Sequence, residues 1–151
     1  MIRLEQVQRV FQVGDQAVHA LDGVDLTIEP GEYVSIMGPS GSGKSTLLNI
    51  LGLLDRPDAG RYLLEGRDVT DLTDAEQARV RRNQIGFVFQ FFHLIPRMTA
   101  AENVELPLVL EGVEPGERRR RVDKVLEAVG LSDRARHRPD QLSGGQRQRV
   151  A

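Results

Sequence analysis

The sequence predicts an α/β protein with strands at its N-terminus and helices in its second half. Residues 1–28 alternate polar and apolar side chains between turn residues, as strands do. A glycine-rich stretch, residues 38–46, lies between a short apolar run and a helical pattern. Beyond residue 90 the apolar spacing becomes that of amphipathic helices. These observations predict a sheet first, a strand–loop–helix unit next, and a helical subdomain last.

Composition limits the classes of function that this chain can have. The chain has 151 residues, 40% hydrophobic and 28% charged, which suits one soluble domain. Its lack of cysteine excludes disulfides and thiolate chemistry, and a net charge of −2 gives no footprint for nucleic acid. No window reaches the roughly 18 apolar residues of a membrane span, and no signal peptide is present. We expect a cytoplasmic protein with no nucleic-acid partner, whose membrane contacts go through another subunit.

The first half contains the expected strands. Two alternating strands end at the turn Pro30-Gly31, and a third segment turns at Glu65-Gly66. Two continuous apolar runs, "YVSIM" (33–37) and "IGFVFQ" (85–90), are typical of buried parallel strands. A helix apolar nearly all round is expected at 45–54. The alternating strands are expected at 1–13, 18–28 and 61–69.

Capping patterns mark the predicted helices. Thr73 with Glu76, and Thr99 with Glu102, have the capping-box spacing at the heads of helices 74–84 and 100–112. Pro107 is expected to kink or end the second of these. A further helix, 115–130, has a proline near its start and a glycine as its C-cap. Its four arginines, 118–121, could bind phosphate, but a solvated helix face is the simpler interpretation.

The stretch "GPSGSGKST" (38–46) carries the chemistry. It has the spacing of a phosphate-binding loop, and glycines let consecutive backbone N–H groups turn inward around anionic oxygens. The following helix adds partial positive charge at the same point. Lys44 would reach the β- and γ-phosphates, the Ser45 hydroxyl would bind Mg²⁺, and Thr46 is placed for the α-phosphate. The alternative, a glycine-rich turn that merely starts a helix, fits this context less well.

A second motif, "LSGGQ" at 142–146, selects among nucleotide-binding proteins. With residues 38–46 and a strand-end glutamine, Gln90, between them, the chain resembles the ATP-binding-cassette (ABC) transporter ATPases over its whole length. The segment "IGFVFQFFHLIPRMTAAENVELPLVLEGV" is similar to the lipoprotein-releasing and macrolide-export subgroup. The implied fold is a P-loop NTPase core with an N-terminal antiparallel β subdomain and an inserted α-helical subdomain.

The resemblance implies a role for each motif. Phe11 would stack on adenine, and the less favoured alternative is a core aromatic of the first strand. Gln90 would offer an amide oxygen to Mg²⁺. Ser143 and the glycines after it would face the γ-phosphate held by a second ATPase subunit in a head-to-tail dimer. A turn without function is the alternative for that motif.

A transmembrane permease subunit is the implied partner. Its coupling helix would lie against a groove formed by side chains that follow Gln90, some of which would also pack the helical subdomain. The protein would then lie on the inner face of the cell membrane. The residues of this groove are Phe91, Phe92, Leu94 and Ile95.

The expected catalytic groups are incomplete. Family members take a base and a Mg²⁺ ligand from an apolar strand ending in Asp-Glu, and a switch histidine follows it. No apolar run of this chain ends in Asp-Glu, and none of its three histidines matches the switch. We therefore expect a domain truncated before the Walker B strand, inactive alone, with the runs 33–37 and 85–90 exposed along an edge. The histidines are His19, His93 and His137.

The expected function is the ATP-binding subunit of an ABC transporter, an ATPase when complete. The alternatives are a non-hydrolysing nucleotide-binding remnant or degenerate gene product, and a soluble cassette protein of repair or translation. The expected domain, 1–151, divides into 1–90 and 91–151. The nucleotide residues are Phe11, Gly38, Pro39, Ser40, Gly41, Ser42, Gly43, Lys44, Ser45 and Thr46; the metal ligands are Ser45 and Gln90; the signature is Leu142, Ser143, Gly144, Gly145 and Gln146.

Overall fold

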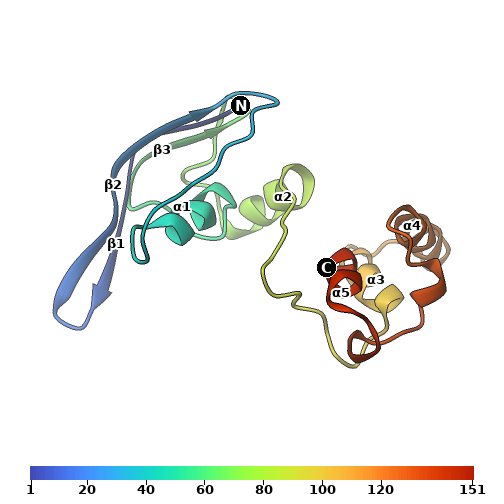
Figure 1. Ribbon diagram of the computed structural model, residues 1–151. Coiled ribbons are helices and arrows are strands. Elements are labelled where there is room, and N and C mark those ends of the chain that lie inside the picture. The colour runs from blue at the N-terminus through green and yellow to red at the C-terminus, as the bar shows by residue number, and fades with distance from the viewer. The chain divides into compact units, whose positions relative to one another are not determined.

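The computed structural model describes all of residues 1–151, which form two compact units, 1–87 and 88–151. The first unit contains an antiparallel sheet with two helices and the second is helical, as Figure 1 shows. The α/β class expected from the sequence is confirmed. The division into 1–90 and 91–151 of one incomplete domain stays a prediction.

The sheet of the first unit has four antiparallel strands in the order β2-β1-β3-β4. Its longest part is a hairpin in which Ile2 pairs with Ile28 and Phe11 with Val18. β1 also pairs with β3, and a turn at Glu65-Gly66 leads into the short β4. The strands expected near the N-terminus and around residue 65 are therefore confirmed. The strands are β1 (Ile2–Val13), β2 (Gln16–Ile28), β3 (Ala59–Leu64) and β4 (Arg67–Asp68).

Irregular pairing in β1 decides which of its side chains enter the core. Leu4 and Val7 are three residues apart, so strict alternation would place them on opposite faces. The register shifts between them, and both are buried, with 2% and 0% of their surface exposed. Further shifts follow on either side of Arg9. Such bulges re-aim side chains along a strand, and here they keep one face of β1 apolar.

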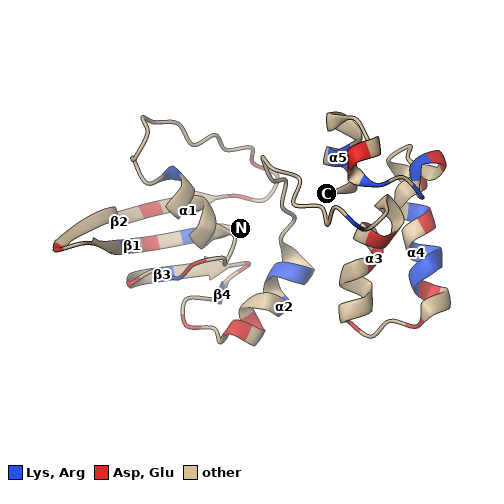
Figure 2. Cartoon of the chain, turned by 90° about the horizontal axis from the view of Figure 1, so that it is seen from below, with Lys and Arg blue, Asp and Glu red and all other residues tan.

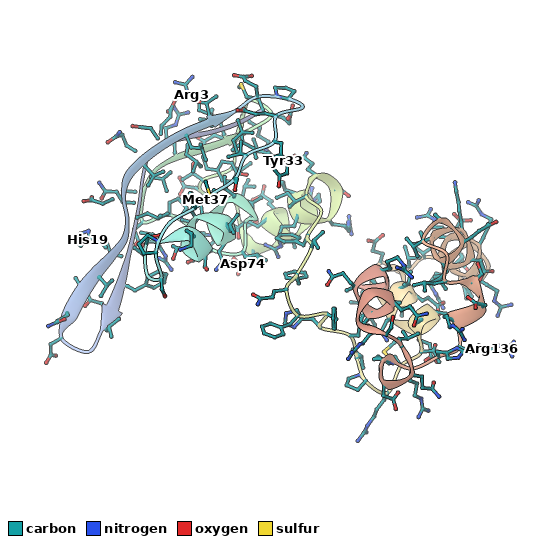
Figure 3. All side chains as sticks on the ribbon, in the orientation of Figure 1. Arg3, His19, Tyr33, Met37, Asp74 and Arg136 are labelled. Carbon is teal, nitrogen blue, oxygen red and sulfur yellow. The ribbon has the colours of Figure 1, made fainter.

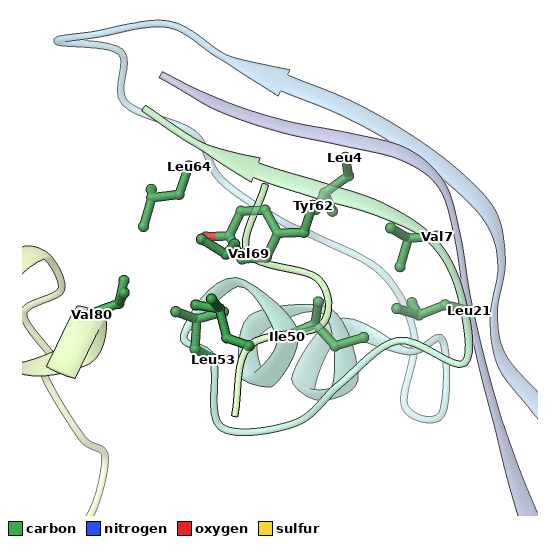
Figure 4. Close-up of a cluster of buried hydrophobic side chains, with 10 residues drawn as sticks. Leu4, Val7, Leu21, Ile50, Leu53, Tyr62, Leu64, Val69 and Val80 are labelled. Carbon is green, nitrogen blue, oxygen red and sulfur yellow. The ribbon is translucent and has the colours of Figure 1, made fainter. Parts of the chain in front are cut away.

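The core of the first unit lies between one face of the sheet and the helices α1 (Lys44–Leu51) and α2 (Asp74–Gln84). In Figure 4 Tyr62 projects from β3 toward Ile50 and Leu53. The Tyr62 hydroxyl donates to the Leu51 carbonyl at 2.8 Å, so the buried phenol is satisfied. The helix expected to reach residue 54 ends at Leu51, because Gly52 caps it and Leu53 has a positive φ of 54°. The buried members are Leu4, Val7, Leu21, Ile50, Leu53, Tyr62, Leu64, Val69, Leu72 and Val80.

The two buried parallel strands expected at 33–37 and 85–90 do not form, and this expectation was wrong. Both segments are irregular, and none of the four strands pairs with either of them. Tyr33, Met37 and Val88 have 94%, 86% and 87% of their surface exposed, and Figure 3 labels the first two. A strand is held by hydrogen bonds to a neighbouring strand, so an apolar run without such a neighbour keeps no regular structure.

The second unit consists of helices around a separate apolar cluster. The longer helices α3 and α4 pack on one another, and α5 joins them through Val150. The head of α3 is tied down by two bonds, from the Ala100 amide to the His137 carbonyl and from the Ala101 amide to the Ala135 carbonyl. None of the chain's helices is long and apolar enough to cross a membrane. The helices are α3 (Ala100–Leu110), α4 (Pro115–Ala128), η1 (Ser132–Arg134), η2 (Pro139–Gln141) and α5 (Gly144–Val150).

The expected helix signals are confirmed, with one exception. Thr73 and Thr99 each form a capping box, and Gly130 follows α4 with a φ of 66°. Pro107, however, does not end α3, which continues to Leu110 with a bond from the Glu111 amide to the Pro107 carbonyl, and the expected kink stays a prediction. Proline removes only one helical hydrogen bond, and packing of the turn that contains Leu108 against the cluster offsets that loss.

The arginine run of α4 is mostly a solvated face, as the simpler interpretation expected. Arg120 and Arg121 both pair with Glu117, and their hydrogen bonds lower the pKa of that carboxyl to about 2. Arg118 differs, because it is half-buried and bonds Glu105 of α3 at 2.7 Å. Figure 2 shows charges of both signs along α4. One arginine of the run therefore joins two helices while its neighbours remain at the surface.

Tyr62 makes the stability of the protein sensitive to alkali. Burial raises the pKa of its phenol to about 12, from an ordinary value of 10. A group with a raised folded pKa contributes fully below pH 10 and loses its contribution as the pH rises toward 12, a loss of about 2–3 kcal/mol. We expect the free energy of unfolding of Tyr62→Phe to fall less over this window than that of the unchanged protein. Denaturant unfolding at pH 9, 10, 11 and 12 measures it.

Tyr33→Phe is the matched control, because it removes a phenol from the exposed side chain of the only other tyrosine. Its free energy of unfolding should fall between pH 10 and 12 by as much as that of the unchanged protein. Equal pH profiles for the two variants would contradict the burial argument.

Candidate functional site

The glycine-rich stretch forms a loop that packs tightly against the sheet. Residues 38–43 are irregular, and α1 begins at Lys44 with Gly43 as its N-cap at a φ of 83°. A Cβ on Gly43 would lie 2.2 Å from the carbonyl oxygen of Ala20 on β2. A Cβ on Gly38 would lie 2.7 Å from the Ser42 hydroxyl oxygen. Gly43 has no room for a side chain because the Ala20 backbone is fixed, whereas the close atom at Gly38 belongs to a serine side chain that can rotate. The loop's backbone therefore approaches the strand closely at Gly43.

Lys44 lies over its own loop. Its ammonium donates to the carbonyls of Gly38 at 2.9 Å and Pro39 at 2.5 Å, and to the Ser42 hydroxyl at 3.3 Å. These three acceptors belong to the turn that the glycines form. The charge of Lys44 is thereby held at the mouth of the loop, where the sequence predicted an anion. The loop residues Pro39, Ser40, Gly41 and Ser42 are exposed around it.

The predicted metal and α-phosphate contacts occupy the first turn of α1. Ser45 is exposed and Thr46 is half-buried, one and two residues after the start of the helix. The hydroxyl of Ser45 is therefore accessible beside the amides that begin the helix, which have no acceptor within it. No group of three or more His, Cys, Asp or Glu side chains in residues 1–151 could hold a metal ion. A divalent cation at this loop would depend on hydroxyl, amide, phosphate and water oxygens, which suits Mg²⁺.

Phe11 lies near the free end of the hairpin, with 37% of its surface exposed. The guanidinium of Arg9 lies over its ring, 4.7 Å from the ring centroid. The core interpretation that the sequence left open does not hold, because Phe11 belongs to none of the apolar clusters. An aromatic ring with an accessible face can stack on a planar base.

The phosphate loop and Phe11 are brought together within the first unit. Ala20, which Gly43 touches, lies in β2 between the residues that pair with Arg9 and Val10. Phe11 is the next residue along β1 and pairs with Val18. With a rise of about 3.4 Å per residue, the ring is roughly 10 Å from the loop, a span that a nucleoside can bridge. Gln90 and the signature belong to the second unit.

Gln90 occupies an exposed irregular segment rather than the end of a strand. The backbone on its N-terminal side is held by α5, since the Gln148 side-chain amide donates to the Phe89 carbonyl at 3.2 Å. On the other side, the guanidinium of Arg147 lies 5.0 Å from the centroid of the Phe92 ring. Two side chains of one helix thus flank the glutamine's backbone.

The signature residues form the head of α5. Leu142 is buried in the second cluster, and Gly144 and Gly145 are exposed. The Ser143 hydroxyl accepts from the Gln146 amide at 3.3 Å, and the Gln146 side chain accepts from the Ser143 amide at 2.8 Å. This third capping box was not predicted from the sequence, although its S-x-x-Q spacing could have shown it. It leaves the two glycine amides pointing out of the helix end.

Sequence reasoning also missed an ion-pair cluster beside Phe11. Arg9 bonds Asp55 through two nitrogens, at 3.0 and 2.9 Å, and Asp58 through the third, at 2.7 Å. Arg9 is two residues before Phe11, and residues at that spacing lie on the same face of a strand. The sequence could therefore have predicted that the two side chains are neighbours. The aspartates follow α1, some 46 residues later, and only the fold brings them to Arg9.

Comparisons with known proteins give a consistent result. A family model described as "ABC transporter" matches residues 21–151. The ABC transporter ATP-binding protein YknY of Bacillus subtilis is 54% identical over 151 residues, which are all of this chain and 66% of that protein. The macrolide export ATP-binding/permease protein MacB of Marinobacter nauticus is 56% identical over the same residues, 23% of its length. The chain spans less than two thirds of the length of each relative.

A solved structure agrees with the fold. The dimeric structure of MJ0796, a bacterial ABC transporter cassette, has a TM-score of 0.85 and 49% identity to this chain, over 99% of this chain and 66% of that one. MJ0796 has also been solved as a dimer in a post-hydrolysis state, bound to ADP and Pi, with the same TM-score.

Gly43→Ala tests whether contact with β2 shapes the phosphate loop. Gly41→Ala is the matched control, because Gly41 has a similar φ of 81° but open space where its Cβ would lie. The control should cost about 1–2 kcal/mol of unfolding free energy, from left-handed backbone strain alone. Gly43→Ala adds a clash with the Ala20 carbonyl and should cost about 3 kcal/mol or more. Denaturant unfolding measures both, and equal costs would mean that the loop does not depend on this contact.

Proposed function

The chain belongs to the ABC transporter family, and on this basis we propose that residues 38–46 bind the phosphates of ATP as part of a transporter's ATP-binding subunit. The observation that carries the proposal is the loop's geometry. Its backbone is held against β2 at Gly43, and its lysine charge lies at the mouth. A glycine-rich turn at the start of a helix, with a cation fixed beside it, is suited to phosphate oxygens.

Lys44 would exchange its bonds to the loop carbonyls for bonds to the β- and γ-phosphates. Its three acceptors are neutral oxygens, and a phosphate offers charged ones, which make stronger hydrogen bonds with an ammonium. The exposed amides at the head of α1 would contribute further donors. Phe11 would stack on adenine with its accessible face.

Mg²⁺ is the metal that suits this site. We propose that it binds the Ser45 hydroxyl and phosphate oxygens, with Gln90 offering its amide oxygen. Bound Mg²⁺ would neutralise charge on the phosphates during hydrolysis. Support for Gln90 comes from its exposure and from the contacts of α5 with the Phe89 carbonyl before it and the Phe92 ring after it.

A second ATPase subunit would complete the site through the signature. We propose a head-to-tail dimer in which Ser143 and the two glycines after it meet the γ-phosphate held by the partner's phosphate loop. The relative MJ0796 is a dimeric cassette, which supports this arrangement. The exposed amides of Gly144 and Gly145 would supply the donors.

The other proposed partner is a transmembrane permease subunit, which would hold the protein at the inner face of the membrane. MacB, by its name, combines ATP-binding and permease functions in one chain. Of the side chains expected to meet the permease, Phe91 and Ile95 have 70% and 40% of their surface exposed. Leu94 packs on the second cluster, and Phe92 lies against Arg147. The exposed pair is available for a partner, while the other two support the subdomain.

Lys44→Ala should lower the affinity for Mg·ATP by about a hundredfold or more, because charge-assisted bonds to two phosphates are lost. Lys124→Ala, which removes the only other lysine, is the matched control and should bind as the unchanged protein does. Titration with a fluorescent ATP analogue measures both, and circular dichroism checks that each variant is folded. Unchanged affinity in Lys44→Ala would refute the assignment of residues 38–46.

Ser143→Arg should leave ATP binding by a single subunit unchanged while blocking the dimer. The larger, charged side chain would fill the space in which the partner's γ-phosphate lies. Sedimentation in the presence of Mg·ATP should then show monomers where the unchanged protein forms dimers. A variant that still forms dimers with Mg·ATP would refute the head-to-tail arrangement.

A further inference from the structure

The cluster around Arg9 connects the end of the hairpin to the segment that follows α1. Arg9 lies on β1 and pairs with Leu21 of β2, while Asp55 and Asp58 follow the helix. All three kinds of guanidinium nitrogen are engaged, Nε and Nη2 by Asp55 and Nη1 by Asp58. The Arg9 side chain keeps only 22% of its surface exposed. A two-pronged ion pair with a third bond fixes the plane of a guanidinium as well as its position.

Asp58 is fixed in turn by the strand. Its other carboxylate oxygen accepts a hydrogen bond of 2.7 Å from the backbone amide of Val10, the residue that follows Arg9. That bond, followed by the bonds of Arg9, holds the pKa of Asp58 below its usual value. Asp58 therefore remains charged near neutral pH and ties the segment after α1 to the backbone of β1.

The guanidinium plane of Arg9 covers one face of the Phe11 ring. The guanidinium carbon lies 4.7 Å from the ring centroid, within the range of a cation–π contact. Phe11 as a whole still has 37% of its surface exposed, so a second planar group has access to its side chain. The guanidinium takes one of the two faces, and a base must approach the other.

We propose that Arg9 is a positioning residue for the base of the nucleotide, acting through Phe11. The guanidinium, the phenyl ring and the base would form three stacked layers, in which Arg9 fixes the ring and limits the base to one face. This inference rests on the proposed function, since it concerns the base of a nucleotide whose phosphates lie at residues 38–46. The same cluster lies at the C-terminal end of α1, so one scaffold positions both the ring and the phosphate loop.

A purely structural role for Arg9 makes a different prediction. An anchor that only joins the hairpin to the segment after α1 would affect stability, and would weaken the binding of any phosphate ligand equally. A residue that acts through Phe11 must change the preference for a ligand that carries a base. The ratio of two affinities, for ATP and for inorganic tripolyphosphate, separates these roles because only ATP has a base.

The experiment measures both dissociation constants by calorimetry with Mg²⁺ present. Phe11→Ala should reduce the preference for ATP by about five- to a hundredfold, as loss of one stacked base contact does. Arg9→Ala should reduce it by about three- to tenfold, the size of a cation–π contact, with the tripolyphosphate constant little changed. In the Phe11→Ala background, Arg9→Ala should produce no further loss, because the ring it acts through is gone.

Two further variants control for the loss of an arginine from β1 and for the loss of positive charge at residue 9. Arg3→Ala removes an arginine near the start of β1, and Figure 3 shows Arg3 well along the sheet from His19, which pairs with Val10 beside Arg9. It should leave the ratio unchanged. Arg9→Lys keeps the positive charge but not the planar, two-pronged group, and should reduce the ratio about two- to threefold, which keeps the test available if Arg9→Ala does not fold.

The outcomes separate this inference from the proposed function. If the unchanged protein binds neither ligand, the proposed function fails. If Phe11→Ala loses the preference for ATP while both Arg9 variants keep it, only the role of Arg9 is overturned. An equal effect of Arg9→Ala with and without Phe11 would also overturn it, since the residue would then act by another route.

Discussion

The close contact between Gly43 and the carbonyl of Ala20 is the constraint on which the first unit's site depends. It places the head of α1 directly on β2, at a distance that no side chain at residue 43 would permit. The position of the phosphate loop is thereby set by the backbone of a strand rather than by contacts of flexible side chains. The apolar cluster beneath, with Ile50 of α1 against Val7 and Leu21 of the hairpin, holds the helix in that place. A loop held in this way at its end has less conformational freedom to lose when a ligand binds, which lowers the entropy cost of binding.

The two ends of α1 are fastened to the same hairpin by different physics. At its head, the absence of a Cβ on Gly43 lets the backbone pack directly on β2. After its end, the contact is electrostatic, because Asp55 and Asp58 bond Arg9. The electrostatic fastening is partly buried and two-pronged, so it is less weakened by salt than an exposed pair. A rigid link between helix and hairpin is what a site divided between them requires.

The sequence predicted the local features of this fold well and its long-range features poorly. The capping boxes at Thr73 and Thr99, the glycine after α4 and the hairpin follow from the chemistry of neighbouring residues, and all are present. The apolar runs at 33–37 and 85–90 resemble strands by composition, yet a strand depends on partners that composition does not reveal. The same holds for Arg9: its place beside Phe11 was implicit in strand periodicity, but its aspartates were not. The residues of the phosphate loop were predictable because their spacing alone specifies the backbone they need.

The capping boxes at Thr73 and Ser143 differ in whether the cap residue's hydroxyl donates within the box. At Thr73 the hydroxyl donates to the Glu76 carboxylate at 2.7 Å, so its proton is used within the box. At Ser143 the side chain of the partner, Gln146, accepts from the Ser143 amide, and the hydroxyl oxygen accepts from the Gln146 amide. The Ser143 hydroxyl thus donates no bond within its box, and its proton is available to a group outside the helix. A residue that closes its own helix thereby keeps a donor in reserve, and a neutral glutamine in place of an acidic partner keeps negative charge away from that donor.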